Sequence, residues 1–245
     1  MIATIGIKML EITATHWNGT NTIHPTLIWD ENEAVLIDAG YPGQLPLIRE
    51  AMEQAGVPFE KLTHLIITHQ DLDHIGSMPN IIIEASQPIQ VLANELEKPY
   101  IQGEKRLIKL TDQAIASLDS LPDEWREGVR RLFMNPPRAD VDRVVTDGEQ
   151  LPFGGGLTII NTPGHTPGHI SLYYHASKTL IAADAMNVVD GKLTGPAPQY
   201  TYDLVQARAS LKKLAAYDIE TVICYHGGMY TGDANKRIAE LADEE

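Results

Sequence analysis

The chain has 245 residues, of which 43% are hydrophobic and 21% are charged. This composition is typical of a globular protein with a sizeable core. The 33 Asp and Glu residues outnumber the 19 Lys and Arg residues, so the formal net charge is −14. That balance argues against nucleic acid as a partner and against docking on an anionic membrane, because both surfaces attract clusters of basic side chains.

The single cysteine, Cys224, excludes a scaffold held together by intramolecular disulfides and favours a reducing cytoplasm. Residues 1–11 lack the basic region and the continuous apolar core of a signal peptide. No apolar run reaches the length of about 18 residues that predicts a membrane-spanning helix. We therefore expect a cytoplasmic protein whose partner is a small-molecule substrate.

Strands and helices alternate along the first hundred residues. Asp30, Glu31 and Asn32 separate two apolar runs and predict a hairpin turn. The predicted elements are strands over 22–29, 34–37, 62–68 and 89–92, and helices over 45–55 and from about residue 76 to 83.

Residues 94–138 differ from the segments on either side, because they are charged and carry apolar residues at helical spacing. We expect two helices inserted between strands and ended by Pro136 and Pro137. Trp125, Phe133 and Met134 are the predicted core of this insertion. The insertion could serve as a lid over a functional site or as a contact in a homodimer.

Strand patterning returns after the insertion. The predicted elements are strands over 141–145, 157–160, 170–174, 179–182 and 221–224, and helices over 203–216 and 234–241. Because strands are followed by helices in both halves, we expect an α/β fold in which helices cover the outer faces of two sheets. No repeat or linker divides the chain, so residues 1–245 are interpreted as one domain.

Two histidines and two aspartates lie within six residues after the predicted strand 62–68. They are His69, Asp71, Asp73 and His74. Carboxylates this close together in a partly buried loop repel each other unless a cation compensates them. Because imidazoles and carboxylates are usual ligands of zinc, iron and manganese, the cluster predicts a metal site rather than a solvated loop.

Three later features point to the same chemistry. Residues 162–169 repeat Thr-Pro-Gly-His, and the prolines and glycines fix the path of the chain around His165 and His169. Asp184 and His226 each follow an apolar run. The end of a strand is a common position for site residues in layered α/β folds, so both join the candidate ligands.

With these elements in this order, the sequence resembles the metallo-β-lactamase superfamily. The family's first motif, His-x-His-x-Asp-His, stands here as residues 69–74. The resemblance implies a four-layer αββα sandwich that binds two divalent metal ions, with zinc favoured and iron or manganese as alternatives. By the same resemblance, the ligands are His69, Asp71 and His165 for one metal, Asp73, His74 and His226 for the second, and Asp184 bridging both.

One position departs from the family motif, since its second histidine is Asp71 here. Flavodiiron proteins of the same fold carry a glutamate at that place, so a carboxylate is compatible with a dinuclear site. The extra carboxylate makes the first metal position more anionic and shifts its preference toward iron or manganese.

The resemblance also implies a hydrolase. In such a site two metal ions turn a bridging water into hydroxide and polarise the substrate's carbonyl or phosphoryl oxygen. Asp73 is the expected catalytic residue, which orients that nucleophile or takes its proton. The expected substrate is a small ester, thioester, lactone or phosphodiester. Two alternatives stay open: an iron-dependent oxidoreductase of the same fold and a non-catalytic metal-binding sensor.

The Thr-Pro-Gly-His repeat resembles the glyoxalase II and lactonase branches of the family. Neither branch matches fully, because Asn187 replaces the tyrosine of lactonases and Asp71 replaces a histidine of glyoxalase II. We expect the insertion and residues near 187, 198–200 and 229–230 to select the substrate.

Several other residues are expected to support the fold rather than bind metal. Asp38 is predicted to hold backbone amides, and His169 to fix its own loop. Cys224 is predicted to be a buried thiol. The isolated histidines are expected at the surface or in hairpins, and they are His16, His24, His64 and His175.

Overall fold

The computed structural model describes residues 5–17 and 19–244 of the chain. Residues 1–4 lie outside this range. They belong to the segment 1–11, whose sequence we interpreted as unlike that of a signal peptide. Within it, no helix has the length and apolar character needed to cross a membrane.

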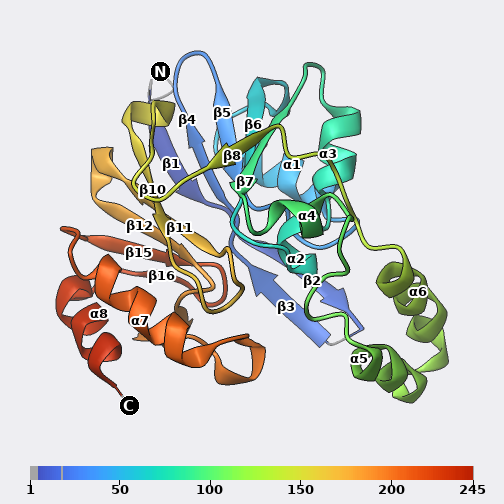
Figure 1. The fold of residues 1–245 in the computed structure, drawn as a ribbon. Helices are drawn as coiled ribbons and strands as arrows, with labels where there is room; N and C mark the ends of the chain where they lie inside the picture. The colour runs from blue at the N-terminus through green and yellow to red at the C-terminus, as the bar shows by residue number, and fades with distance from the viewer. Residues whose placement is uncertain (1–4, 18, 245) are drawn as a thin grey trace.

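A six-stranded sheet occupies the first half of the molecule (Figure 1). Its strands, in spatial order, are β1 (Gly6–Met9), β4 (Thr26–Trp29), β5 (Ala34–Ile37), β6 (Leu62–Ile67), β7 (Gln90–Asn94) and β8 (Arg143–Val145). β1, β4 and β5 pair antiparallel, whereas β5 through β8 run parallel. The loops after β5, β6 and β7 therefore leave the sheet at the same edge.

The second half forms another six-stranded sheet. Its strands, in spatial order, are β16 (Gly228–Tyr230), β15 (Thr221–Cys224), β12 (Thr179–Ala183), β11 (Ile170–Tyr174), β10 (Leu157–Asn161) and β9 (Gln150–Leu151). All neighbours pair antiparallel except β12 and β15, which are parallel. Loops after β12 and β15 consequently emerge side by side.

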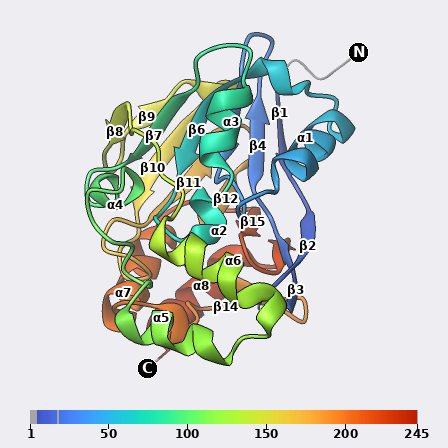
Figure 2. The same ribbon diagram turned by 90° about the vertical axis from the view of Figure 1, so that its right-hand side faces the viewer.

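Helices cover the outer face of each sheet, and the two inner faces pack together (Figures 1 and 2). Ile37 and Ile66 of the first sheet share a buried cluster with Leu172 and Ile181 of the second. The covering helices are α1 (Leu45–Gln54) and α3 (Met78–Glu84) on the first sheet, and α7 (Leu204–Leu214) and α8 (Ala234–Asp243) on the second. The layers follow the order helix, sheet, sheet, helix, which confirms the predicted αββα sandwich.

Local sequence signals account for many element ends. α1 and α3 have a proline in the first turn, where a missing N–H costs no helical hydrogen bond. The side chains of Asp203 and Asp233 accept hydrogen bonds from backbone N–H groups in the first turns of α7 and α8. Five 3-10 turns complete the connections within the described residues: η1 (Phe59–Lys61), η2 (Leu118–Ser120), η3 (Phe153–Gly155), η4 (His175–Ser177) and η5 (Pro198–Tyr200).

Some predicted elements differ from the structure. The strand predicted over 22–29 is two strands, because β3 (Gly19–Ile23) pairs with β2 (Ile12–His16) and Pro25 cannot donate to a continuing ladder. The helix predicted from residue 76 is preceded by a separate short helix, α2 (Leu72–Ile75). The sequence patterns also missed the hairpin of β13 (Asn187–Val189) and β14 (Lys192–Thr194).

The segment 94–138 contains helices, as predicted. They are the short α4 (Lys98–Ile101), α5 (Asp112–Ser117) and α6 (Asp123–Met134), one more than expected. Phe133 lies edge-on to Trp17, with ring centroids 6.2 Å apart. Met134 is 62% exposed, so its prediction as a core residue is wrong. Figure 2 shows α5 and α6 crossing in front of α7 and α8, at the end of the sandwich that carries the strand-end loops.

The close packing around Gly76 yields a stability prediction. A Cβ at this position would lie 2.3 Å from backbone atoms of both Tyr41 and Pro42. Gly76→Ala must therefore push two loops apart, and we expect it to lower the free energy of unfolding by about 1–3 kcal/mol. The measurement is urea or thermal unfolding.

Gly128 in α6 provides the matched control. A Cβ there meets no atom within 4 Å. Gly128→Ala should stabilise the chain by about 0.5–1 kcal/mol, because alanine loses less entropy than glycine in a helix. Equal stability of Gly76→Ala and the wild type would contradict the packing argument.

Candidate metal centre

The predicted site residues come from both halves of the chain and meet at one end of the sandwich. His69 and Asp71 lie in the loop after β6, and Asp73 and His74 lie in α2 directly behind it. The second sheet contributes His165 from the β10–β11 connection, Asp184 after β12 and His226 after β15. Strands of both sheets therefore end at a common centre, as their apolar runs indicated.

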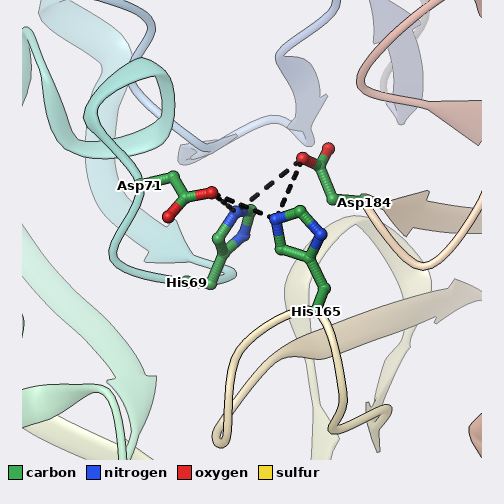
Figure 3. A group of neighbouring side chains, drawn as sticks. All are labelled: His69, Asp71, His165 and Asp184. Atoms are coloured by element: carbon green, nitrogen blue, oxygen red, sulfur yellow. Dashed lines mark hydrogen bonds and ion pairs between the residues drawn. The ribbon is translucent and has the colours of Figure 1, made fainter. Parts of the chain in front are cut away.

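The first group consists of His69, Asp71, His165 and Asp184 (Figure 3). Asp71 Oδ2 lies 3.2 Å from His69 Nε2 and 3.0 Å from His165 Nε2. Asp184 Oδ2 is 3.9 Å from His69 Nε2 and 3.4 Å from His165 Nε2. All four side chains point toward one shared space (Figure 3).

The second group consists of Asp73, His74 and His226. Asp73 Oδ2 lies 3.2 Å from His226 Nε2 and 3.8 Å from His74 Nε2. Asp184 reaches this group as well, with its carboxylate oxygens 3.5 Å from His226 Nε2 and 3.6 Å from His74 Nε2. Asp184 thus lies between the two groups, where the family resemblance places a bridging ligand.

The distances between the nitrogen and oxygen atoms of the two groups match those between ligand atoms around a metal ion. Nitrogen and oxygen ligands bonded at about 2.0–2.1 Å to a tetrahedral zinc are separated from one another by about 3.3 Å. Three atoms at the centre, His69 Nε2, His74 Nε2 and Asp184 Oδ1, are buried and make no hydrogen bond within the described chain. Buried polar atoms without partners are costly, and a cation held between them removes that cost.

Asp38 sets the orientation of the two histidines from the first sheet. Its carboxylate accepts hydrogen bonds from Thr68 N and Thr68 Oγ1, both at 2.8 Å, and from His74 Nδ1 at 2.8 Å. The Thr68 hydroxyl then accepts from His69 Nδ1 at 3.0 Å. With both Nδ1 atoms donating, both Nε2 lone pairs are directed at the centre, as metal ligation requires. Asp38 also holds a backbone amide, as expected.

Opposite charges dominate the electrostatics of the centre. Burial favours the neutral form of His226, but the carboxylates of Asp184 and Asp73 outweigh it and raise the pKa of His226 to about 10. Burial likewise opposes ionisation of Asp184, yet the surrounding histidines hold its pKa well below the ordinary value. The surrounding histidines therefore favour the ionised form of Asp184.

A second buried carboxylate, Glu97, links the two loops that carry ligands. It is fully buried, and it accepts hydrogen bonds from Gln70 N and Nε2 at 3.0 Å and from Gly168 N at 2.7 Å. Burial raises the pKa of Glu97 despite these hydrogen bonds. Sequence reasoning missed this residue, because its partners lie 27 and 71 positions away and leave no local pattern.

Two further side chains at the centre were missed. Tyr225 stacks on His74 with ring centroids 3.8 Å apart, and its hydroxyl donates to the backbone carbonyl of Asp73. Lys109 of the insertion contacts Asp71 and lies with Nζ 2.8 Å from His165 Nε2. A lysine within the apolar run 107–110 was the only sequence signal for this contact.

The expected supporting residues can now be placed. His169 contacts Thr162 through Nδ1 and accepts from the backbone N–H of Asp184 at 3.2 Å, so it positions both its own loop and Asp184. Cys224 is buried, as predicted, and burial raises its pKa. His24 is only 8% exposed and contacts the carbonyl of Tyr225, so its prediction as a surface or hairpin histidine is wrong.

A cleft of about 990 Å³ opens over the centre. Asp71, Asp73, Asp184 and His226 form part of its floor. Its walls include residues of the insertion and of the segment after Asp184, namely Leu107, Lys109, Leu110, Phe133, Asn187, Gln199, Tyr200 and Arg208. Met229 and Tyr230, which we expected to help select a substrate, are not among the described residues that line it.

The sandwich with a His and Asp cluster at the ends of its strands defines the class of metal-binding hydrolases. Residues 19–226 match the family described as the metallo-β-lactamase superfamily. The chain is 32% identical over 227 residues to the probable metallo-hydrolase YflN of Bacillus subtilis, across 85% of this chain and 81% of that one. The chain therefore belongs to the metallo-β-lactamase superfamily, and it is a hydrolase of that superfamily.

Two other similarities extend over nearly the whole chain. Hydroxyacylglutathione hydrolase GloC of Haemophilus influenzae is 26% identical over 240 residues, across 95% of this chain and 96% of that one. The crystal structure of the metallo-β-lactamase family protein TTHA1429 from Thermus thermophilus aligns with a TM-score of 0.70 at 23% identity. That alignment covers 97% of this chain and 78% of the other, and it supports the fold.

The contacts of Glu97 lead to a prediction. In Glu97→Gln an amide NH₂ replaces one acceptor oxygen, so at least one buried N–H of Gln70 or Gly168 loses its partner. We expect a loss of about 1–3 kcal/mol in the free energy of unfolding, measured by chemical denaturation. Glu95→Gln, two positions away at an exposed residue, should leave stability unchanged. Equal stabilities of the two variants would show that the link contributes nothing.

Proposed function

We propose that the chain binds two divalent metal ions and hydrolyses a small ester, thioester, lactone or phosphodiester. The single observation that carries the proposal is the position of Asp184, within 3.4–3.9 Å of histidine nitrogens from both groups. A carboxylate shared in this way is suited to hold two cations at once. Residues 1–245 act in this proposal as one domain, in which the insertion 94–138 serves as a lid.

The two groups supply the ligands. The first metal is assigned to His69, Asp71 and His165, and Asp184 is shared with the second. The second metal is assigned to Asp73, His74 and His226. When bound, two such cations supply a water of lowered pKa and polarise the oxygen of the scissile group.

Asp73 is the proposed catalytic residue. Its carboxylate Oδ2 lies 3.2 Å from His226 Nε2, and its side chain is 14% exposed and borders the cleft. One carboxylate oxygen can therefore serve as a ligand while the other orients an incoming nucleophile or takes its proton. Asp73 is also fixed through its backbone carbonyl, which accepts from the Tyr225 hydroxyl.

The cleft supports the substrate class. A volume of about 990 Å³ suits a small molecule, and its walls carry apolar side chains such as Leu107 and Phe133 as well as the basic Lys109 and Arg208. The similarity to a hydroxyacylglutathione hydrolase favours an ester or thioester within this class. Hydrolysis by purified protein of a panel of esters, thioesters, lactones and phosphodiesters tests the proposal.

Zinc is the metal we propose, and Asp71 brings iron and manganese into consideration because a carboxylate is a harder ligand than an imidazole. Metal analysis of protein purified without added metal should give two ions per chain. A redox-active absorption band would instead favour an iron-dependent oxidoreductase. Two bound metals without turnover of any substrate in the panel would favour a metal-binding sensor.

Asp73→Ala and Asp184→Ala test the assigned roles. Both should abolish turnover, with losses of more than about a hundredfold, since changes of mere supporting residues already cost 10–100-fold. Neither should unfold the chain, as checked by circular dichroism. Asp140→Ala, at an exposed aspartate outside the cleft, is the control and should keep wild-type activity. A near wild-type rate in either centre variant would refute the assignment.

A further inference from the structure

Lys109 places an ammonium group at the first group of predicted ligands. Its ammonium contacts Asp71 Oδ2 and lies 2.8 Å from His165 Nε2. These two atoms are themselves 3.0 Å apart. Among the residues that the structure describes, no other lysine or arginine makes a recorded hydrogen bond or ion pair with any of the seven predicted ligands.

The chain around Lys109 is held firmly. Leu107 and Leu110 are each only 4% exposed and belong to the core that lies against the first sheet. Between them, Ile108 N donates to Gln70 Oε1 at 2.8 Å, and Gln70 is in turn bound by Glu97. The Lys109 side chain, which is 34% exposed, can move while its backbone stays in place.

The ammonium and a metal ion need the same atoms. An ammonium has only donors, so it can bond to His165 only through the Nε2 lone pair. That lone pair and Asp71 Oδ2 are the atoms that a metal at the first group would use. A metal ion there and the observed position of Lys109 are therefore mutually exclusive.

Charge explains why a lysine is suited to this place. Asp71 and Asp184 both border the first group, and in the family motif position 71 is an imidazole. The carboxylate adds a negative charge to a buried space, and the Lys109 ammonium in contact with Asp71 compensates that charge. No lysine or arginine of the described residues makes a hydrogen bond or ion pair with Asp73, His74 or His226.

We propose that the Lys109 ammonium competes with the first metal ion for its ligands. The group of Asp73, His74 and His226 then binds metal first. The group of His69, Asp71 and His165 binds metal second, as Lys109 moves out. This inference rests on the proposed dinuclear site. It adds that the two metal positions differ in affinity because of the Lys109 side chain.

Zinc titration tests the proposal. Metal-depleted full-length chain is titrated with Zn²⁺ in competition with a chromogenic chelator. The wild type should show one tight and one weaker ion. Lys109→Met removes the competing charge, and the Kd of the weaker ion should fall about tenfold, or about 1.4 kcal/mol. Lys105→Met, an exposed lysine of the same segment that lies over the Tyr100 ring, should match the wild type.

Lysine acetylation followed by mass spectrometry provides a second readout. Zn²⁺ should increase the labelling of Lys109, because the displaced ammonium enters the cleft, while the labelling of Lys105 stays constant. A Lys109 side chain that stays in place would show no increase, so the direction of the change is diagnostic. Lys109→Gln replaces Lys109→Met in the titration if the methionine variant does not fold.

The outcomes separate the two proposals. Two zinc ions bound with unchanged affinities in Lys109→Met, or weaker binding in that variant, would overturn the competition and leave the dinuclear site intact. A decrease in the acetylation of Lys109 when zinc is added would likewise overturn the competition and leave the dinuclear site intact. A wild-type chain that binds no zinc, iron or manganese would overturn the proposed function and this inference together.

Discussion

Three carboxylates, from Asp71, Asp73 and Asp184, are gathered at the buried end of the sandwich. Ionised carboxylates at such separations repel one another, and burial increases the cost. Four histidines and one lysine surround them with nitrogen atoms, and the Lys109 ammonium supplies a compensating positive charge. The remaining features of the centre follow from this need to balance negative charge in a confined space.

Two other buried acids support the centre without entering it. Asp38 fixes the histidines that follow β6, and Glu97 joins the loop of Gln70 to the loop of Gly168. Each accepts at least three hydrogen bonds, which compensates its burial. The positions of the predicted ligands are thus set by neighbouring acids that are as buried as the core residues.

The sequence predicted the parts of the structure that depend on local signals. β6 and β12 were visible as short apolar runs, and the acids and histidines at their ends were recognisable from residue type and order. Lys109 and Glu97 were not, because their roles arise only when the insertion folds back onto the loop after β6. His24 was misplaced for a similar reason, since its burial depends on Tyr225, which lies 201 positions away.

The division of the predicted ligands between the two halves of the chain has a consequence for stability. Residues 69–74 follow β6 of the first sheet, whereas His165, Asp184 and His226 follow strands β10, β12 and β15 of the second. Any ion held by both sets joins the two sheets and is released when they separate. By mass action, a ligand at a hundred times its Kd adds about 2.7 kcal/mol to the free energy of unfolding. The chain's resistance to unfolding would then follow the free metal concentration around it, as well as its own packing.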